Sequence, residues 1–123
     1  MTLTTLVETV SVIPMSCHIG DNVEYGADLT VGERVWIFGR NITIGKGVAI
    51  GDFVHIVGND ITIHDGAVIG DFVTIGADTT VGAGATIQAR SDVLNVTIDP
   101  GMTLPGNACY HMAAQIDAAR YQN

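Results

Sequence analysis

Aliphatic residues recur along most of this chain at a spacing of six, and glycine follows many of them. Only the steps Ile37 to Ile44 and Ile56 to Ile63 are seven residues long. A spacing of six is far from the 3.6-residue period of a helix, and the enrichment in β-branched residues favours short strands. The positions of this series are Ile19, Tyr25, Val31, Ile37, Ile44, Ile50, Ile56, Ile63, Ile69, Ile75, Val81, Ile87 and Val93.

A longer period of nineteen residues contains three of these shorter steps. The segments that begin at Val31, Ile50 and Ile69 have almost the same pattern of apolar, glycine and polar positions. A repeat of this size is typical of a solenoid, in which each turn buries its apolar side only by stacking on its neighbours. Three sides of about six residues predict a triangular coil, with coils about 4.8 Å apart. The extra residue in IFGRNITI and IVGNDITI is expected at one corner.

The six-residue motif resembles the hexapeptide repeat of left-handed parallel β-helix proteins. It reads IGKGVA, IGDFVH, IGDFVT, IGADTT and VGAGAT, and the resemblance covers residues 19–98. It implies an all-β chain, a single-stranded left-handed parallel β-helix of about four to five triangular coils. Proteins of this family are usually homotrimers and often acyltransferases, and some are γ-class carbonic anhydrases.

The chain is expected to form one domain with three parts. Residues 1–18 would be an apolar N-terminal cap that covers the open edge of the first coil. Residues 19–98 would form the β-helix. Residues 99–123 would begin with an exit turn, marked by two Pro-Gly pairs, and end in a short helix that starts near Asn107.

Composition narrows the range of partners. Thirteen acidic residues against five basic ones give a net charge of −8, which opposes binding to nucleic acid and to anionic membranes. No apolar run reaches the roughly 18 residues of a membrane span, and the first residues contain no basic segment typical of a signal peptide. Cys17 and Cys109 do not suggest a disulfide framework, so we expect a cytoplasmic protein.

Alternation along the strands predicts which side chains face outward. Val35, Val54 and Val73 should point into the core, and Trp36, His55 and Thr74 should form an outward column, joined by Glu24. Two further outward columns contain Arg34 with two phenylalanines, and Phe38 with Val57. A monomer would rarely expose so large an apolar patch, so we expect a homotrimer interface, with a ligand-binding wall as the alternative. The expected interface residues are Trp36, Phe38, Phe53, Val57 and Phe72.

His55 and His64 are the candidate catalytic bases. The family resemblance implies a histidine base at a cleft between subunits. One acetyltransferase motif, Val-Trp-Ile-Gly-Ser-His, is matched by VWIFGR with Arg40 in place of the histidine, and an arginine stays protonated. In a second motif, the base falls at the position that Asp65 occupies in this chain. This chain has one extra residue in that segment, which moves His64 to the corner. His55 matches a secondary histidine of that second group, which contacts the acyl donor.

A metal site and a coenzyme A site are less well supported by the residues. A γ-class zinc site needs three histidines from two subunits, and only His64 has a position typical of such a ligand. His18, His111 and the two cysteines are isolated. The C-terminal segment offers Arg120 as its only base for the phosphates of coenzyme A. No cofactor is therefore expected, with acetyl-CoA or zinc only under the alternatives.

Three functions remain in order of preference. The first is a non-catalytic trimeric solenoid that serves as a structural, assembly or docking module. The alternative is a small acyl-CoA-dependent acyltransferase with an inter-subunit active site and His55 or His64 as base. The third is a metal-binding protein that resembles γ-class carbonic anhydrases.

Overall fold

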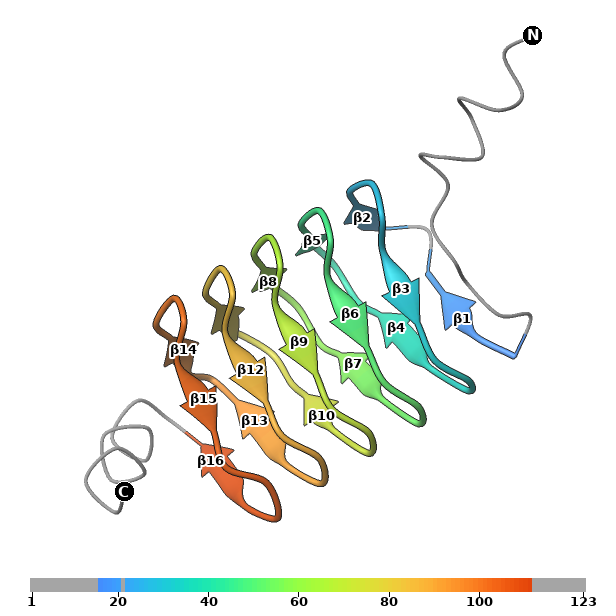
Figure 1. Cartoon of the computed structure of the whole chain (residues 1–123). Helices are drawn as coiled ribbons and strands as arrows, with labels where there is room; N and C mark the ends of the chain where they lie inside the picture. The colour runs from blue at the N-terminus through green and yellow to red at the C-terminus, as the bar shows by residue number, and fades with distance from the viewer. Residues whose placement is uncertain (1–15, 21, 112–123) are drawn as a thin grey trace, which may run out of the picture.

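The computed structural model describes residues 16–20 and 22–111, which form a parallel β-solenoid of about five turns (Figure 1). The strands form three sheets, which we name after their first strands. The β1 sheet contains β1 (His18–Ile19), β4 (Trp36–Phe38), β7 (His55–Val57), β10 (Thr74–Ile75), β13 (Asp92–Leu94) and β16 (Cys109–His111). The β2 sheet contains β2 (Val23–Tyr25), β5 (Ile42–Ile44), β8 (Ile61–Ile63), β11 (Thr80–Val81) and β14 (Thr97–Ile98). The β3 sheet contains β3 (Thr30–Val31), β6 (Ala49–Ile50), β9 (Val68–Ile69), β12 (Thr86–Ile87) and β15 (Thr103–Leu104).

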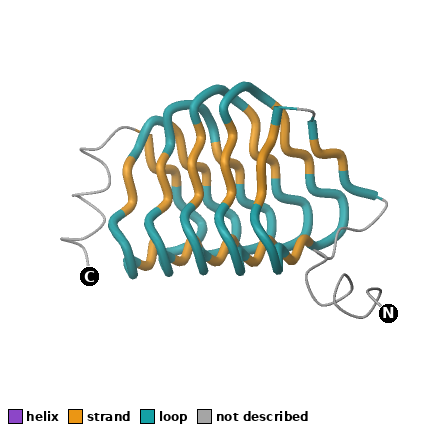
Figure 2. Tube along the Cα trace, turned by 90° about the horizontal axis from the view of Figure 1, so that it is seen from above, coloured by secondary structure: helices purple, strands orange, loops and turns teal. Residues whose placement is uncertain are grey.

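Each strand pairs with the strand one full turn further along the chain, and all pairs are parallel. Successive coils therefore stand side by side along the solenoid axis (Figure 2). The register places the aliphatic positions on one another: Ile37 pairs with Ile56, and Ile56 with Ile75. From Val31 onward the six-residue series thus becomes an internal column on each sheet, as the sequence predicts. In the first described coil Ile19 is only half-buried and Tyr25 is exposed, which differs from the prediction.

The core consists of two inward positions per side of the triangle. The first is the aliphatic position, and the second lies two residues earlier. Val35, Val54 and Val73 occupy the second position and are fully buried, which confirms their predicted place. Burying one such branched side chain contributes about 1.5–3 kcal/mol, so the stacked columns supply most of the stability of the solenoid.

Two polar residues replace aliphatic ones in this core. Thr79 accepts a hydrogen bond from the Asn95 backbone N–H (3.2 Å) and donates one to the Ala77 carbonyl (3.4 Å). Ser91 donates to the Gln88 carbonyl (3.0 Å). Both hydroxyl groups are therefore satisfied, which removes the penalty for burying them.

The extra residues of the two seven-residue steps lie at the corner between the β1 and β2 sheets, as predicted. Gly39 and Gly58 have φ angles of 147° and 146° there. A Cβ atom on Gly39 would also collide with the carbonyl oxygen of Gly58. Only glycine fits both the backbone conformation and the close approach of two coils.

The solenoid extends beyond residue 98, where the sequence-based boundary was drawn. β15 and β16 add to the β3 and β1 sheets, and Leu104 and Tyr110 continue the six-residue series inside the core. Pro100-Gly101 and Pro105-Gly106 lie at corners of this last coil instead of in an exit turn. A corner and an exit turn need the same residue types, so the Pro-Gly pairs could not distinguish them.

A helix was expected to begin near Asn107, but the structure has a strand at that place. Asn107 has a φ of 57°, and Cys109–His111 form β16, which pairs with β13. The remainder of that expected helix, and all but the last residues of the expected N-terminal cap, lie outside the described residues. No helix that could cross a membrane occurs in the part of the chain that the structure describes.

The two faces of one strand should respond very differently to mutation. Ile63 is fully buried, whereas Thr62 beside it on β8 faces outward. We expect Ile63→Ala to lower the free energy of unfolding by about 2–5 kcal/mol. Thr62→Ala should change it by less than about 0.5 kcal/mol. Urea unfolding followed by circular dichroism measures both values, and equal losses would contradict the assigned register.

Candidate active site

The outward face of the β1 sheet carries the largest group of exposed apolar side chains among the described residues. Its central column contains His18, Trp36, His55, Thr74 and Asp92, which are paired strand by strand. Six of the eight large apolar side chains that the described residues leave exposed lie on this face or at its edge. We call them the apolar face: Trp36, Phe38, Phe53, Val57, Phe72 and Leu94.

The predicted place of Glu24 in the central column was wrong. Glu24 was expected beneath Trp36, but it lies on β2 opposite Thr43. His18 on β1 is the residue that pairs with Trp36. The expectation counted two sides of the triangle from Glu24 to Trp36, whereas a full turn requires three.

His55 lies on the apolar face beside an open hollow. Its imidazole is exposed, and its ring centroid is 6.2 Å from that of Trp36. His18 contacts the other side of Trp36 edge-on at 5.1 Å. The hollow has a volume of about 440 Å³, and its lining residues are Ser16, His18, Arg34, Trp36, Phe53 and His55. An accessible imidazole among aromatic rings can accept a proton from a bound amine or hydroxyl group.

One corner of the coil has an unusual composition. Residues with φ near +60° occur at all three corners. At the corner between the β1 and β2 sheets and at the corner between the β2 and β3 sheets they are only Asn, Asp and Gly, which tolerate this conformation. At the corner between the β3 and β1 sheets, four successive coils have a bulky residue in this conformation, at a cost of about 1–3 kcal/mol each. These residues, which we call the aromatic corner, are Arg34, Phe53, Phe72 and Arg90.

The four side chains of the aromatic corner form one stack. The Phe53 and Phe72 rings are parallel, with centroids 5.0 Å apart. The guanidinium group of Arg34 lies 6.0 Å from the Phe53 centroid, and that of Arg90 lies 5.7 Å from the Phe72 centroid. The sequence pattern predicted the first three residues as a column and did not include Arg90. Its position three residues before the aliphatic Val93 was the available signal.

His64 lies elsewhere on the solenoid. It directly follows β8 of the β2 sheet, and its side chain lines a separate hollow of about 250 Å³ with Thr80, Thr97 and Pro100 among its neighbours. A single chain therefore does not bring His55 and His64 into one site.

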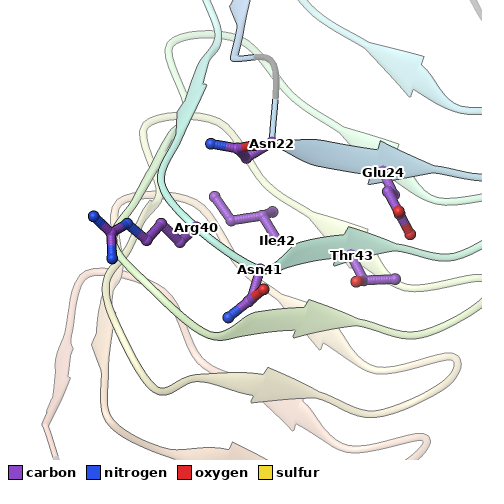
Figure 3. Close-up of a pocket in the computed structure, with 6 residues that line it drawn as sticks. All are labelled: Asn22, Glu24, Arg40, Asn41, Ile42 and Thr43. Atoms are coloured by element: carbon purple, nitrogen blue, oxygen red, sulfur yellow. The ribbon is translucent and has the colours of Figure 1, made fainter.

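The polar hollow in Figure 3 surrounds the place where one acetyltransferase motif would carry its base. Arg40 and Asn41 precede β5, and Asn22 and Glu24 come from the coil before. The Arg40 side chain points away from Glu24 and Thr43 in this view (Figure 3). Arg40 cannot serve as a base, since its guanidinium group stays protonated.

Several acidic residues have structural partners at the corners. Asp71 accepts a hydrogen bond from the Asp52 backbone N–H, and Asp52 accepts one from Glu33, both at 2.8 Å. The Ser16 hydroxyl donates to the Glu33 carboxylate at 2.8 Å. Part of the net charge of −8 thus has a structural role, since these carboxylates stabilise the corner backbone.

The described residues contain no group of three or more histidine, cysteine or acidic side chains that could hold a metal ion within one chain. Cys17 donates to the Gly32 carbonyl (3.0 Å), and Cys109 lies 3.8 Å from an Asp92 carboxylate oxygen. Burial raises the pKa of Tyr110, whose hydroxyl donates to the Pro105 carbonyl at 2.8 Å. These groups have structural partners and do not converge on a site.

Comparison with known proteins identifies the repeat. The bacterial transferase hexapeptide family (six repeats) matches residues 56–89. No curated protein sequence matches the chain. The match confirms the hexapeptide-repeat resemblance predicted from the sequence.

Two solved structures share the fold. The acetyltransferase domain of PglB from Neisseria gonorrhoeae FA1090, in complex with acetyl coenzyme A, is 16% identical with a TM-score of 0.59. It covers 87% of this chain, which spans 61% of that domain. A variant of perosamine N-acetyltransferase from Caulobacter crescentus, in complex with CoA and GDP-perosamine, is 17% identical with a TM-score of 0.53. It covers 83% of this chain, which spans 51% of that protein. At these identities the likeness establishes a common hexapeptide-repeat β-helix fold.

These neighbours correct the preferred sequence-based function. A non-catalytic structural module was placed first because the expected base and a basic tail were missing. The neighbours are acetyltransferases that contain acetyl-CoA or CoA, so the comparisons favour the acyltransferase alternative over that module. The earlier preference also relied on the acidic charge and the short length of the chain, and neither feature excludes the reaction class of these neighbours.

Asp65, the residue at one expected base position, should prove structural. Its carboxylate accepts a hydrogen bond from the Lys46 backbone N–H at 2.8 Å. We expect Asp65→Ala to lower the free energy of unfolding by about 1–3 kcal/mol. Asp65→Asn keeps an acceptor oxygen and should lose less, as thermal unfolding would show. An Asp65→Asn variant that folds normally but loses acetyl transfer would instead identify this residue as the base.

Proposed function

We propose that this protein is an acetyl-CoA-dependent acetyltransferase that works as a homotrimer, with His55 as its general base. The observation that supports this proposal most strongly is the exposed imidazole of His55 in a hollow lined by Trp36 and Phe53. The acetyltransferase neighbours with bound acetyl-CoA or CoA give the proposal its reaction class.

In the proposed reaction, acetyl-CoA supplies an acetyl group as a thioester. His55 accepts the proton of an acceptor amine or hydroxyl group as that group attacks the thioester carbonyl. A new C–N or C–O bond forms, the C–S bond breaks, and the proton leaves with the CoA thiolate. Positioned proton transfer of this kind contributes about 10²–10⁴-fold to a rate.

The apolar face supports the trimer. It is continuous along the β1 sheet, and Trp36, Phe38 and Val57 lie on neighbouring columns of it. Water-exposed patches of this kind are rare in monomers, and a three-fold arrangement would cover one on each copy. The hollow beside His55 opens on the same face, so a neighbouring copy would close it and exclude water from the reaction.

Two histidine variants test the assignment of the base. We expect His55→Ala to lower the rate of acetyl transfer by about 10²–10⁴-fold, because the acceptor would keep its proton. His64→Ala changes an exposed histidine on another sheet and should leave the rate within about twofold. Release of CoA thiol from acetyl-CoA, measured against a panel of amines and alcohols, gives both rates. A loss confined to His64→Ala would transfer the role to that residue.

A matched pair of valine variants tests the trimer. Val57 on the apolar face and Val68 on the β3 sheet are both outward and exposed. Val57→Asp should place an unpaired charge in the interface at a cost of about 3–5 kcal/mol for each copy and yield monomers. Val68→Asp should leave the assembly unchanged. Sedimentation velocity measures both, and a monomeric wild-type protein would refute the interface.

A further inference from the structure

The hollow beside His55 differs in charge from the rest of the molecule. The chain has a net charge of −8, yet the hollow is lined by one guanidinium group, two imidazoles, two aromatic rings and a serine. Among the residues that the structure describes, no carboxylate belongs to this lining. The Ser16 hydroxyl donates a hydrogen bond to the Glu33 carboxylate. Arg34 is the residue of this lining whose side chain is always charged.

Arg34 is held in place by its surroundings. Its φ of 59° belongs to the left-handed region, which a long side chain adopts only where other contacts compensate. Its backbone N–H donates to the Ser16 hydroxyl at 2.9 Å, and its guanidinium group lies over the Phe53 ring. A guanidinium group above an aromatic ring keeps its N–H donors in its own plane, directed away from the ring.

Those donors have no partner among the described residues. The side chain of Arg34 makes no hydrogen bond or ion pair with them, and the residue is exposed. The planar fork of an arginine matches a phosphate or carboxylate through two parallel hydrogen bonds. The ring beneath it fixes the orientation of that fork before a ligand arrives.

We propose that Arg34 binds a phosphate group of one of the two substrates at the His55 hollow. That phosphate belongs either to the acyl donor, whose nucleotide end carries phosphates, or to a phosphorylated acceptor. This inference uses the proposed function to identify the substrates, whereas the binding of the anion can be measured without any turnover.

The chain contains a matched control for Arg34. Arg90 has a φ of 64°, and its guanidinium group lies over the Phe72 ring just as that of Arg34 lies over the Phe53 ring. Arg90 does not line the hollow. Arg34→Gln and Arg90→Gln therefore remove the same charge and a similar ring contact from the same corner, and only the first removes a group from the site.

The test uses isothermal titration calorimetry of the full-length wild-type protein and both variants at low ionic strength. The probes are adenosine 3′,5′-bisphosphate for the donor, and phosphoethanolamine with ethanolamine for an acceptor with and without a phosphate. We expect at least one anionic probe to bind the wild type at least about tenfold more tightly than Arg34→Gln. Arg90→Gln should remain within twofold of the wild type, and the probe that binds identifies the source of the anion.

Two outcomes would overturn the inference. One is an equal effect of the two arginine variants on binding. The other is a wild-type protein that binds neither anionic probe, or that binds ethanolamine as tightly as phosphoethanolamine. Absence of acetyl transfer together with binding that depends on Arg34 would reject the proposed function and keep the anion site.

Discussion

Stacking of identical aliphatic positions between successive coils is the interaction on which the whole structure depends. A single coil has too little interior to bury its own apolar side chains, so each coil is stable only on its neighbours. The parallel in-register pairing places isoleucine on isoleucine along each sheet, as in the contact of Ile37, Ile56 and Ile75. Corner residues such as Gly39 and Asp71 then allow the coils to approach closely enough for that contact.

This constraint applies to the inward positions and leaves the outward ones free to change from coil to coil. The central column of the β1 sheet changes from His18 to Trp36 to His55 and Thr74 while the core beside it stays aliphatic. A site can therefore be built on the wall of the solenoid at little cost to the fold. The strained residues of the aromatic corner are the exception, since Arg34 and Phe53 lower the stability of a corner that Asn or Gly would favour.

Sequence patterns do not distinguish two structures that require the same residue types. Pro-Gly pairs are suited to both corners and exit turns, so the last coil was assigned as an exit. The absence of a histidine at the known motif positions favoured a non-catalytic module, with His55 and His64 kept as bases only under the acyltransferase alternative. The stacking of Arg90 on Phe72 was missed although both residues lie three positions before an aliphatic residue of the six-residue series.

The sequence by itself determined the triangular solenoid, its inward residues from Val31 to Val93 and the corner of the two insertions. The reason is that a repeated period needs only local geometry and burial to specify one solution. Tertiary structure alone decided that the solenoid continues through β16, which residue lies under Trp36, and that Arg34 and His55 line one hollow whereas His64 lines another. Those facts depend on the exact number of residues at every corner, because a shift of one residue moves each outward side chain to a different neighbour.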